Sequence, residues 1–181
     1  MPHPIPHWFD RTFTFPFEAE IHPYVLSRLR GTPARLEDVT DGLSQSVLTR
    51  RVVLTWSIQE NAGHLLDLEA LWAGRLDDFL AGAETLRAAD LTNQATYAAR
   101  HNDADLHDIL RSFREARASL LSRADALRAE DFARTALHPR LKQPMRLVDH
   151  LFFVAEHDDQ HLARIWEVRR PEGPHYTDRR R

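Results

Sequence analysis

Apolar residues recur at steps of three and four along most of this chain, and this periodicity constrains its fold more than any other feature. Such spacing puts apolar side chains on one face of an α-helix, whereas a half-buried strand alternates apolar and polar residues. The pattern predicts four amphipathic helical stretches, at about residues 17–43, 57–82, 103–127 and 144–170. Four such helices without a convincing strand favour an all-α fold, a four-helix bundle.

Local signals refine these stretches. The triplet Gly31-Thr32-Pro33 should interrupt the first one, because a threonine N-cap followed by proline is typical of a helix start. Ser57 and Glu60 have the spacing of a capping box at the start of the second. Residues 86–102 are consistent with a short helix or with a long crossover.

The ends of the chain differ from its middle. Residues 1–16 contain four prolines and are interpreted as an extended arm. Residues 171–181 end in three arginines and are interpreted as a short solvated tail. The sequence therefore predicts one bundle domain over residues 17–170, flanked by an arm and a tail.

Composition excludes several classes of function. Lys and Arg total 24 against 27 for Asp and Glu, so no basic excess favours nucleic acid or an anionic membrane. No apolar run reaches the roughly 18 residues of a membrane span, and residues 1–8 lack the features of a secretory signal. Cysteine is absent, which excludes thiolate nucleophiles and cysteine-ligated metals. We expect a soluble, cytoplasmic protein.

Histidine is unusually frequent, with 11 residues in 181. His157 and His161 are spaced i, i+4, so on a helix both imidazoles can reach one metal ion. About 0.6 such pairs are expected by chance at this frequency, and His3 and His7 share the spacing in the arm, so spacing alone decides nothing.

The direction of these side chains is more informative. At about 100° per residue, His150, His157 and His161 lie on the apolar side of the fourth helix. An unpaired buried polar group costs about 1–3 kcal/mol, so a metal, or carboxylates and buried water, must satisfy these rings. His64, at the border of the second helix's apolar stripe, is the best third ligand.

Two carboxylates lie on apolar faces and are candidate catalytic residues. Asp158 projects toward the core side of the fourth helix, where it could orient a ligand or act as a base. Glu69 is close to the centre of the second helix's stripe, an expensive place for a lone charge. A structural ion pair is the alternative for each.

Other polar positions receive structural or surface assignments. His101, His107 and Asp67 are expected to face solvent, and His150 to be a hydrogen-bonded core histidine. Gly63 suggests a close helix contact beside the second-helix histidine. Whether His150, or His138 in a loop with Pro139, joins the site stays open.

Three segments carry a resemblance to a known family. The segment from Trp56 to Glu69 resembles the W-S-x-x-E-x-x-x-H-L-x-x-x-E segment of the DinB-like (YfiT-like) superfamily. Residues 138–161 are similar to its last loop and helix, and residues 29–36 to its first helix. The likeness covers about residues 18–168, with the three segments in the family's order.

The resemblance implies an antiparallel bundle with one long crossover and a divalent metal, nickel or zinc, held by His64, His157 and His161. It also implies a homodimer. Members include transferases that use bacillithiol or mycothiol, a mycothiol-dependent isomerase, and many proteins described only as metal-dependent hydrolases.

These observations favour a metal-dependent enzyme acting on a small molecule, of the thiol S-transferase or hydrolase type. Three imidazoles leave a coordination position open for water or a thiolate. Because the chain has no cysteine, any thiol must be a low-molecular-weight co-substrate. One alternative is a non-catalytic, stress-related metal-binding or interaction bundle. Another is a metal-free bundle whose histidines are satisfied by Glu69, Asp158 and Asp149.

Overall fold

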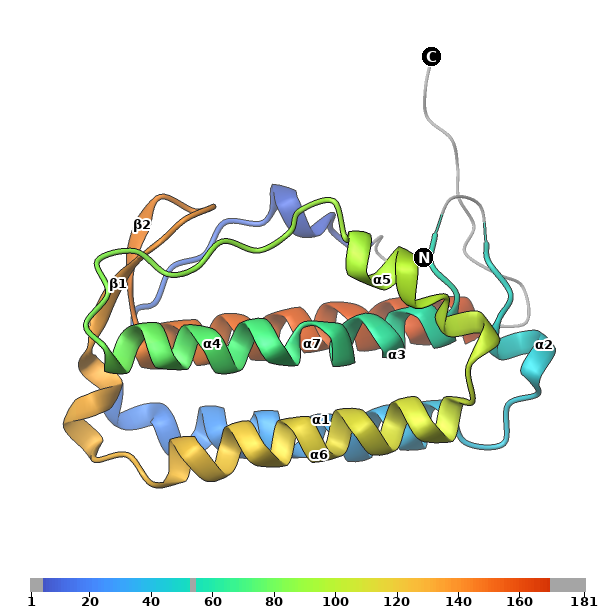
Figure 1. The fold of residues 1–181 in the computed structure, drawn as a ribbon, viewed down its shortest axis with the longest axis horizontal. Coiled ribbons are helices and arrows are strands. Elements are labelled where there is room, and N and C mark those ends of the chain that lie inside the picture. The colour runs from blue at the N-terminus through green and yellow to red at the C-terminus, as the bar shows by residue number, and fades with distance from the viewer. Residues whose placement is uncertain (1–4, 53–54, 170–181) are drawn as a thin grey trace, which may run out of the picture.

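The computed structural model describes residues 5–52 and 55–169, and helices dominate that part of the chain. Four long helical segments form the bundle: α1 (His22–Thr40), α3 (Ile58–Asp67) continued by α4 (Glu69–Leu80), α6 (Leu106–Asp125) and α7 (Leu147–Arg169). The α3–α4 segment and α6 run in one direction, and α1 and α7 run in the other (Figure 1). The prediction of an all-α four-helix bundle is confirmed.

Shorter elements connect these helices. They are α2 (Gln45–Leu48), α5 (Gln94–Ala99), strands β1 (Thr135–His138) and β2 (Gln143–Arg146), and 3₁₀ turns at Trp8–Asp10, Ala19–Ile21, His101–Asp103 and Ala129–Ala133. The two strands pair antiparallel, with Thr135 opposite Arg146. The expectation of no strand is therefore wrong, because strands of four residues are too short to show a clear alternation.

A long crossover joins the end of α4 to the start of α6, which allows these two helices to run the same way. It spans residues 81–105 and contains α5, so both interpretations of residues 86–102 are correct in part. Together with the N-terminal arm, the crossover runs along the side of the bundle formed by α3, α4 and α7 (Figure 1). The expected tail at 171–181 lies outside the described residues. Within the described ranges, no helix is long and apolar enough to cross a membrane.

Helix α1 continues through Pro33, so the predicted break at Gly31-Thr32-Pro33 is wrong. A proline inside a helix deprives the carbonyl four residues earlier of its amide donor. Here that carbonyl belongs to Leu29, and it accepts a hydrogen bond of 3.4 Å from Nη1 of Arg117 instead. Thr32 is not an N-cap, because it is buried within the helix and donates to Asp158.

The second predicted helix is observed as two pieces. Its start is as expected: Ser57 accepts from the backbone N–H of Glu60, and the Glu60 carboxylate accepts from the N–H of Ser57. The pieces meet at Leu68, whose backbone keeps helical angles (φ −83°, ψ −11°). The α3–α4 segment therefore behaves as one support for the residues it presents to the bundle interior.

Two apolar clusters make up the core, and a polar layer lies between them. One cluster surrounds Trp72 and Val154, and the other surrounds Leu65 and Phe113. The intervening buried polar residues are Thr32, Asn61, His64, Glu69, Arg117, His157 and Asp158. Burying this many polar groups is costly unless each finds a partner. The polar layer is therefore the part of the interior in which to look for a functional site.

Candidate metal centre

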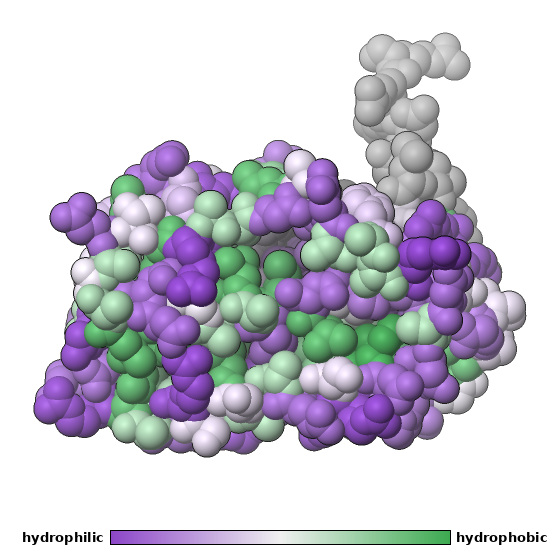
Figure 2. All heavy atoms as spheres, viewed as in Figure 1, coloured by the Kyte–Doolittle hydropathy of each residue, from purple (hydrophilic) through white to green (hydrophobic). Residues whose placement is uncertain are grey.

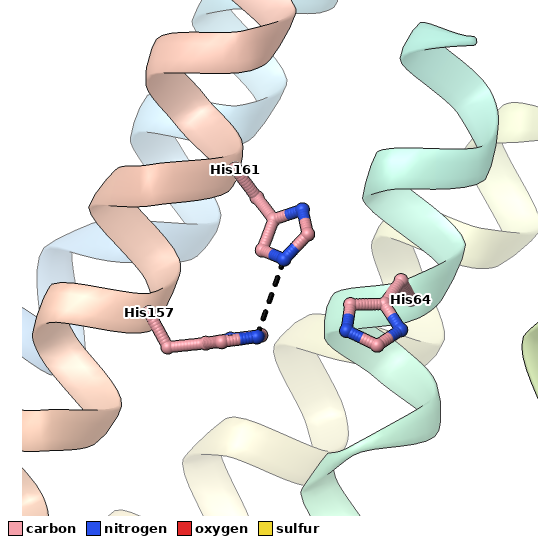
Figure 3. A group of neighbouring side chains, drawn as sticks. All are labelled: His64, His157 and His161. Carbon is pink, nitrogen blue, oxygen red and sulfur yellow. Dashed lines mark hydrogen bonds between the residues drawn. The ribbon is translucent and has the colours of Figure 1, made fainter. Parts of the chain in front are cut away.

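Three histidines from two helices converge in the polar layer. His64 comes from α3, and His157 and His161 come from consecutive turns of α7, with one ligand atom of each within 4.8 Å of the others. The Nε2 atoms of His157 and His161 are 3.2 Å apart, and the His64 ring lies opposite them (Figure 3). The expectation that these three rings come together is confirmed.

Asn61 determines which nitrogen of His161 is free. The Asn61 amide nitrogen donates to the backbone carbonyls of Ser57 and Trp56, at 2.8 and 3.3 Å. Its oxygen therefore faces Nδ1 of His161, 2.8 Å away, and that nitrogen must carry the proton. The Nε2 atom of His161 is left with its lone pair directed at the other histidines.

Thr96 has the same effect on His64. Its hydroxyl oxygen lies 2.9 Å from Nδ1 of His64, and it also hydrogen bonds to the Asp67 carboxylate. Burial raises the pKa of Asp67, but hydrogen bonds from His101 and Thr96 lower it overall, so this carboxylate is ionised and accepts. The single hydroxyl proton of Thr96 goes to Asp67, and Nδ1–H of His64 donates to the hydroxyl oxygen.

The three imidazoles are held in their neutral form. Burial lowers the pKa of His64 to about 4 and that of both α7 histidines well below the ordinary value. His64 further lowers the pKa of His157, and both of these rings lower that of His161. Neutral imidazole is the form that ligates a metal.

The donor set fits a divalent transition metal. Two nitrogens that each lie about 2.0–2.1 Å from a tetrahedral zinc ion are about 3.3 Å apart, close to the observed separation of the two Nε2 atoms of 3.2 Å. Two rings have their outer nitrogen fixed by a protein partner, as metal-ligating histidines usually do. Nδ1 of His157 is the exception, because it is buried without a partner among the described residues.

The trio opens into a cavity of about 600 Å³. The N-terminal arm covers it on one side: Trp8 packs edge-on against His157 with ring centres 5.0 Å apart, and the carbonyl of Pro6 accepts from Gln160. The crossover covers the other side, and Figure 2 shows a hollow between the two. The tryptophans Trp56 and Trp72 also line the cavity.

Asp158 and Glu69 lie elsewhere in the polar layer. Arg117 on α6 donates to Asp158 at 2.6 Å and to Glu69 at 2.6 Å, and all three side chains are buried. Neither carboxylate lines the cavity. This is the structural ion pair that stood as the alternative to a catalytic role for each residue.

Two surface assignments made from the sequence, those of His101 and Asp67, are wrong, whereas His107 is exposed as expected. His101 is buried, and its Nε2 lies 2.9 Å from the Asp67 carboxylate, which is itself mostly buried. A Cβ at Gly63 would come within 2.2 Å of the His101 ring, so Gly63 does mark a close contact, but with the crossover.

The two remaining inward-facing histidines lie outside the trio. His138 is not in a loop but ends β1, where it lines the cavity and is 3.0 Å from Nη1 of Arg75. His150 is buried, but it has no hydrogen bond to the described residues, contrary to the expectation. Burial, with a contribution from Arg75, lowers the pKa of His138 to about 3.

Sequence reasoning missed the residues that support the trio. Thr96 and His101 belong to the crossover, which has no clear periodicity, so no pattern placed them inside the molecule. Arg117 had a usable signal, because it follows Phe113 by four residues and therefore shares the apolar face of α6.

Solved structures share this fold. This chain is similar to YfiT from Bacillus subtilis, described as a probable metal-dependent hydrolase with an unusual four-helix bundle topology, with a TM-score of 0.75 and 21% identity. The match covers 87% of this chain and 91% of that one. A mycothiol-dependent maleylpyruvate isomerase gives a TM-score of 0.63 at 9% identity, covering 78% of this chain and 59% of that one. At these identities the likeness concerns the fold alone.

Sequence comparison assigns the family. No curated protein matches the chain. The sequence model of the DinB superfamily matches residues 28–165, which include α3, the crossover and all three converging histidines. Since that match spans well over half of the sequence, the chain belongs to the DinB superfamily.

Proposed function

We propose that this protein is a metal-dependent enzyme in which His64, His157 and His161 hold a nickel or zinc ion, and that it acts on a small molecule by thiol transfer or hydrolysis. The observation that carries the proposal is the convergence of three neutral imidazoles at the wall of a large cavity. The descriptions of the two solved relatives, one metal-dependent and one mycothiol-dependent, point the same way.

The chemistry of the ion and the roles of the protein groups are separable. A divalent ion with an open position lowers the pKa of a coordinated water or binds a thiolate. Asn61 and Thr96 keep two of the ligands in the metal-binding tautomer. Trp8 and Trp72 both pack against His157 and restrict access of bulk water to it. With no cysteine in the chain, a thiol nucleophile must be a co-substrate.

Elemental analysis of untagged protein tests the metal site. We expect about one equivalent of nickel or zinc in the wild type after reconstitution, and almost none in His157→Ala, because two remaining ligands hold the ion weakly. His107→Ala is the matched control, since His107 is exposed on α6. Equal, near-zero metal in all three proteins would contradict the proposal.

Turnover separates an enzyme from a purely structural metal site. Metal-loaded and chelated protein are assayed for hydrolysis of p-nitrophenyl acetate and for conjugation of glutathione or cysteine to 1-chloro-2,4-dinitrobenzene. We expect metal-dependent turnover in one of these reactions. Strong stabilisation of the fold by metal, without turnover in either, favours the non-catalytic bundle instead.

A further inference from the structure

A second region of the same cavity carries positive charge without a counter-charge. Five side chains with formal charge line the cavity wall: Arg75, Asp90, Arg140, Arg164 and Glu167. Arg164 and Glu167 form an ion pair with each other, at 2.8 Å. Asp90 is exposed and accepts from the backbone N–H groups of its own turn. Arg75 and Arg140 therefore remain as the uncompensated pair.

Arg75 is buried, with only 1% of its surface exposed, yet no carboxylate of the described residues forms an ion pair with it. The acidic side chain that acts on the charge of Arg75 is Asp78, and it is already paired with Arg87 at 2.8 Å. Burial, together with the neighbouring Arg140 and Arg87, lowers the pKa of Arg75 to about 10 against the opposing effect of Asp78. A buried cation is normally paired, so this environment lacks an anion.

Arg140 is in the same condition. Its Nη2 atom is buried without a hydrogen-bond partner in the part of the chain that the structure describes. The guanidinium carbon lies 5.3 Å from the centre of the Phe9 ring and 5.7 Å from that of Phe153, so aromatic faces surround it instead of acceptors. These contacts hold the guanidinium in place but leave its donors free.

Donors also outnumber acceptors at His138, which lies beside both arginines. Nη1 of Arg75 lies 3.0 Å from one ring nitrogen, and the backbone N–H of Leu141 lies 3.2 Å from the other. A neutral imidazole has only one acceptor nitrogen, so one donor is unmatched whichever tautomer is present. The indole N–H of Trp72 is likewise buried without a described partner.

The positive charge, the unmatched hydrogen-bond donors and the aromatic walls are complementary to one class of ligand. We propose that the cavity binds a substrate or co-substrate with an oxyanion group, a carboxylate or a phosphate, held between Arg75 and Arg140 beside the metal centre. An oxyanion supplies several acceptors and the missing charge at once, and guanidinium groups bind it with charge-assisted hydrogen bonds.

The geometry also restricts where the oxyanion lies relative to the reacting end of the molecule. The centre of the Trp72 ring lies 5.5 Å from the guanidinium carbon of Arg75 and 5.8 Å from the centre of the His157 ring. Trp8 makes the same link from Arg140 to His157, at 5.9 and 5.0 Å. The anionic group is thus separated from the metal-bound end by the width of one indole. The inference rests on the proposed function for the reaction, but the binding of an anion does not require the metal.

Small aromatic probes test the site in chelated protein, where no ion can attract the anion. Benzoate and phenylphosphonate are compared with neutral benzamide by isothermal titration. We expect at least one of the two anions to bind at least about tenfold more tightly than benzamide, which is the difference that one charge-assisted hydrogen bond makes. Their ranking shows whether the site prefers a carboxylate or a phosphate. Equal affinity for all three probes overturns the proposal.

Charge-removing variants locate the binding. Arg140→Gln should weaken the preferred anion about tenfold or more and leave benzamide unchanged, with partial recovery in Arg140→Lys. Arg30→Gln is the matched control, because it removes the same charge from an exposed arginine that already has a partner and does not line the cavity. Equal losses in both glutamine variants overturn the proposal. These titrations are carried out without metal. Failure to bind metal in the elemental analysis would therefore contradict the proposed function but leave the proposed anion site unaffected.

Discussion

Asn61 and Thr96 each control a histidine with one hydrogen bond. The amide of Asn61 is oriented by two backbone carbonyls, and the hydroxyl of Thr96 is oriented by Asp67. In both cases a group outside the trio decides which imidazole nitrogen keeps its lone pair. The metal affinity of the site should therefore depend on side chains that never touch the ion.

Replacing Thr96 by valine tests this dependence. The change preserves shape but removes the acceptor for Nδ1–H of His64, so we expect metal affinity to fall about 10- to 100-fold. Competition with a chromogenic chelator measures it. Thr49→Val, at a partly exposed threonine that does not line the cavity, should leave affinity unchanged. An unaltered affinity in Thr96→Val would show that the hydrogen bond does not matter.

His150 is a buried polar ring without a described partner, and its replacement by leucine should stabilise the protein. At pH 7 we expect the free energy of unfolding to rise by about 1 kcal/mol or more, because an unsatisfied group is removed. Chemical denaturation of the two proteins measures the difference.

The pH dependence of that difference follows from the pKa of His150, which burial lowers well below its ordinary value. Below pH of about 6.5 the unfolded chain binds a proton that the native state refuses, so the wild type loses stability as pH falls. His150→Leu lacks this loss, and its advantage should grow by up to about 1.4 kcal/mol per pH unit between pH 6.5 and 5. A constant difference across that range contradicts the assignment.

At the scale of elements, Arg117 ties α6 to three other segments. It donates to Glu69 on α4, to Asp158 on α7, and to the Leu29 carbonyl that Pro33 leaves free on α1. Burial lowers the pKa of Arg117, but Asp158 and Glu69 outweigh that effect and raise it. The guanidinium is thus a fixed cation at the centre of the bundle.

Removing this cation should strongly destabilise the protein. Arg117→Met leaves two carboxylates buried without a counter-charge, and we expect a loss of about 3–5 kcal/mol in the free energy of unfolding. Arg123→Met, at a partly exposed ion pair on the same helix, should cost about 1 kcal/mol or less. Adding Glu69→Gln and Asp158→Asn to the first variant should restore part of the loss. No recovery in the triple variant would mean that packing, and not charge, is responsible.

The sequence predicted these elements to different degrees. Helical periodicity placed His64, His157 and His161 on interior faces correctly, because an amphipathic helix has only one buried side. It failed at Pro33, since the donor that replaces the lost amide comes from a residue 84 positions later. It also failed for Thr96, because burial in an irregular crossover depends on tertiary contacts that leave no period in the sequence.

At the scale of the whole molecule, the cavity is closed by segments that are not part of the bundle. The arm reaches it through Trp8, and the arm is held by Arg11, which forms an ion pair with Glu156, and by Ile5, whose carbonyl accepts from Arg164. Phe13 anchors the arm further, because it is buried in the core against Phe153. Since the arm holds Trp8 against His157, access to the metal centre should be controlled by the arm.

Trp8→Ala tests that control. We expect helical content to stay the same, and the release of metal to excess chelator to become severalfold faster, because the indole that covers His157 is gone. Stopped-flow absorbance with a chelating dye measures the rate. Trp166→Ala provides the comparison, since Trp166 is half exposed on the outside of α7. Equal release rates in the two variants would place the route of exchange elsewhere.

The single guanidinium shared by four helical segments has an evolutionary consequence. The residues at positions 33, 69, 117 and 158 depend on one another through this guanidinium, so a substitution at any of them changes the selection acting on the other three. Across homologous lineages, loss of the arginine should coincide with neutralisation of its two acids and with replacement of the proline. These four residues are far apart in the sequence but are thus expected to change together in evolution.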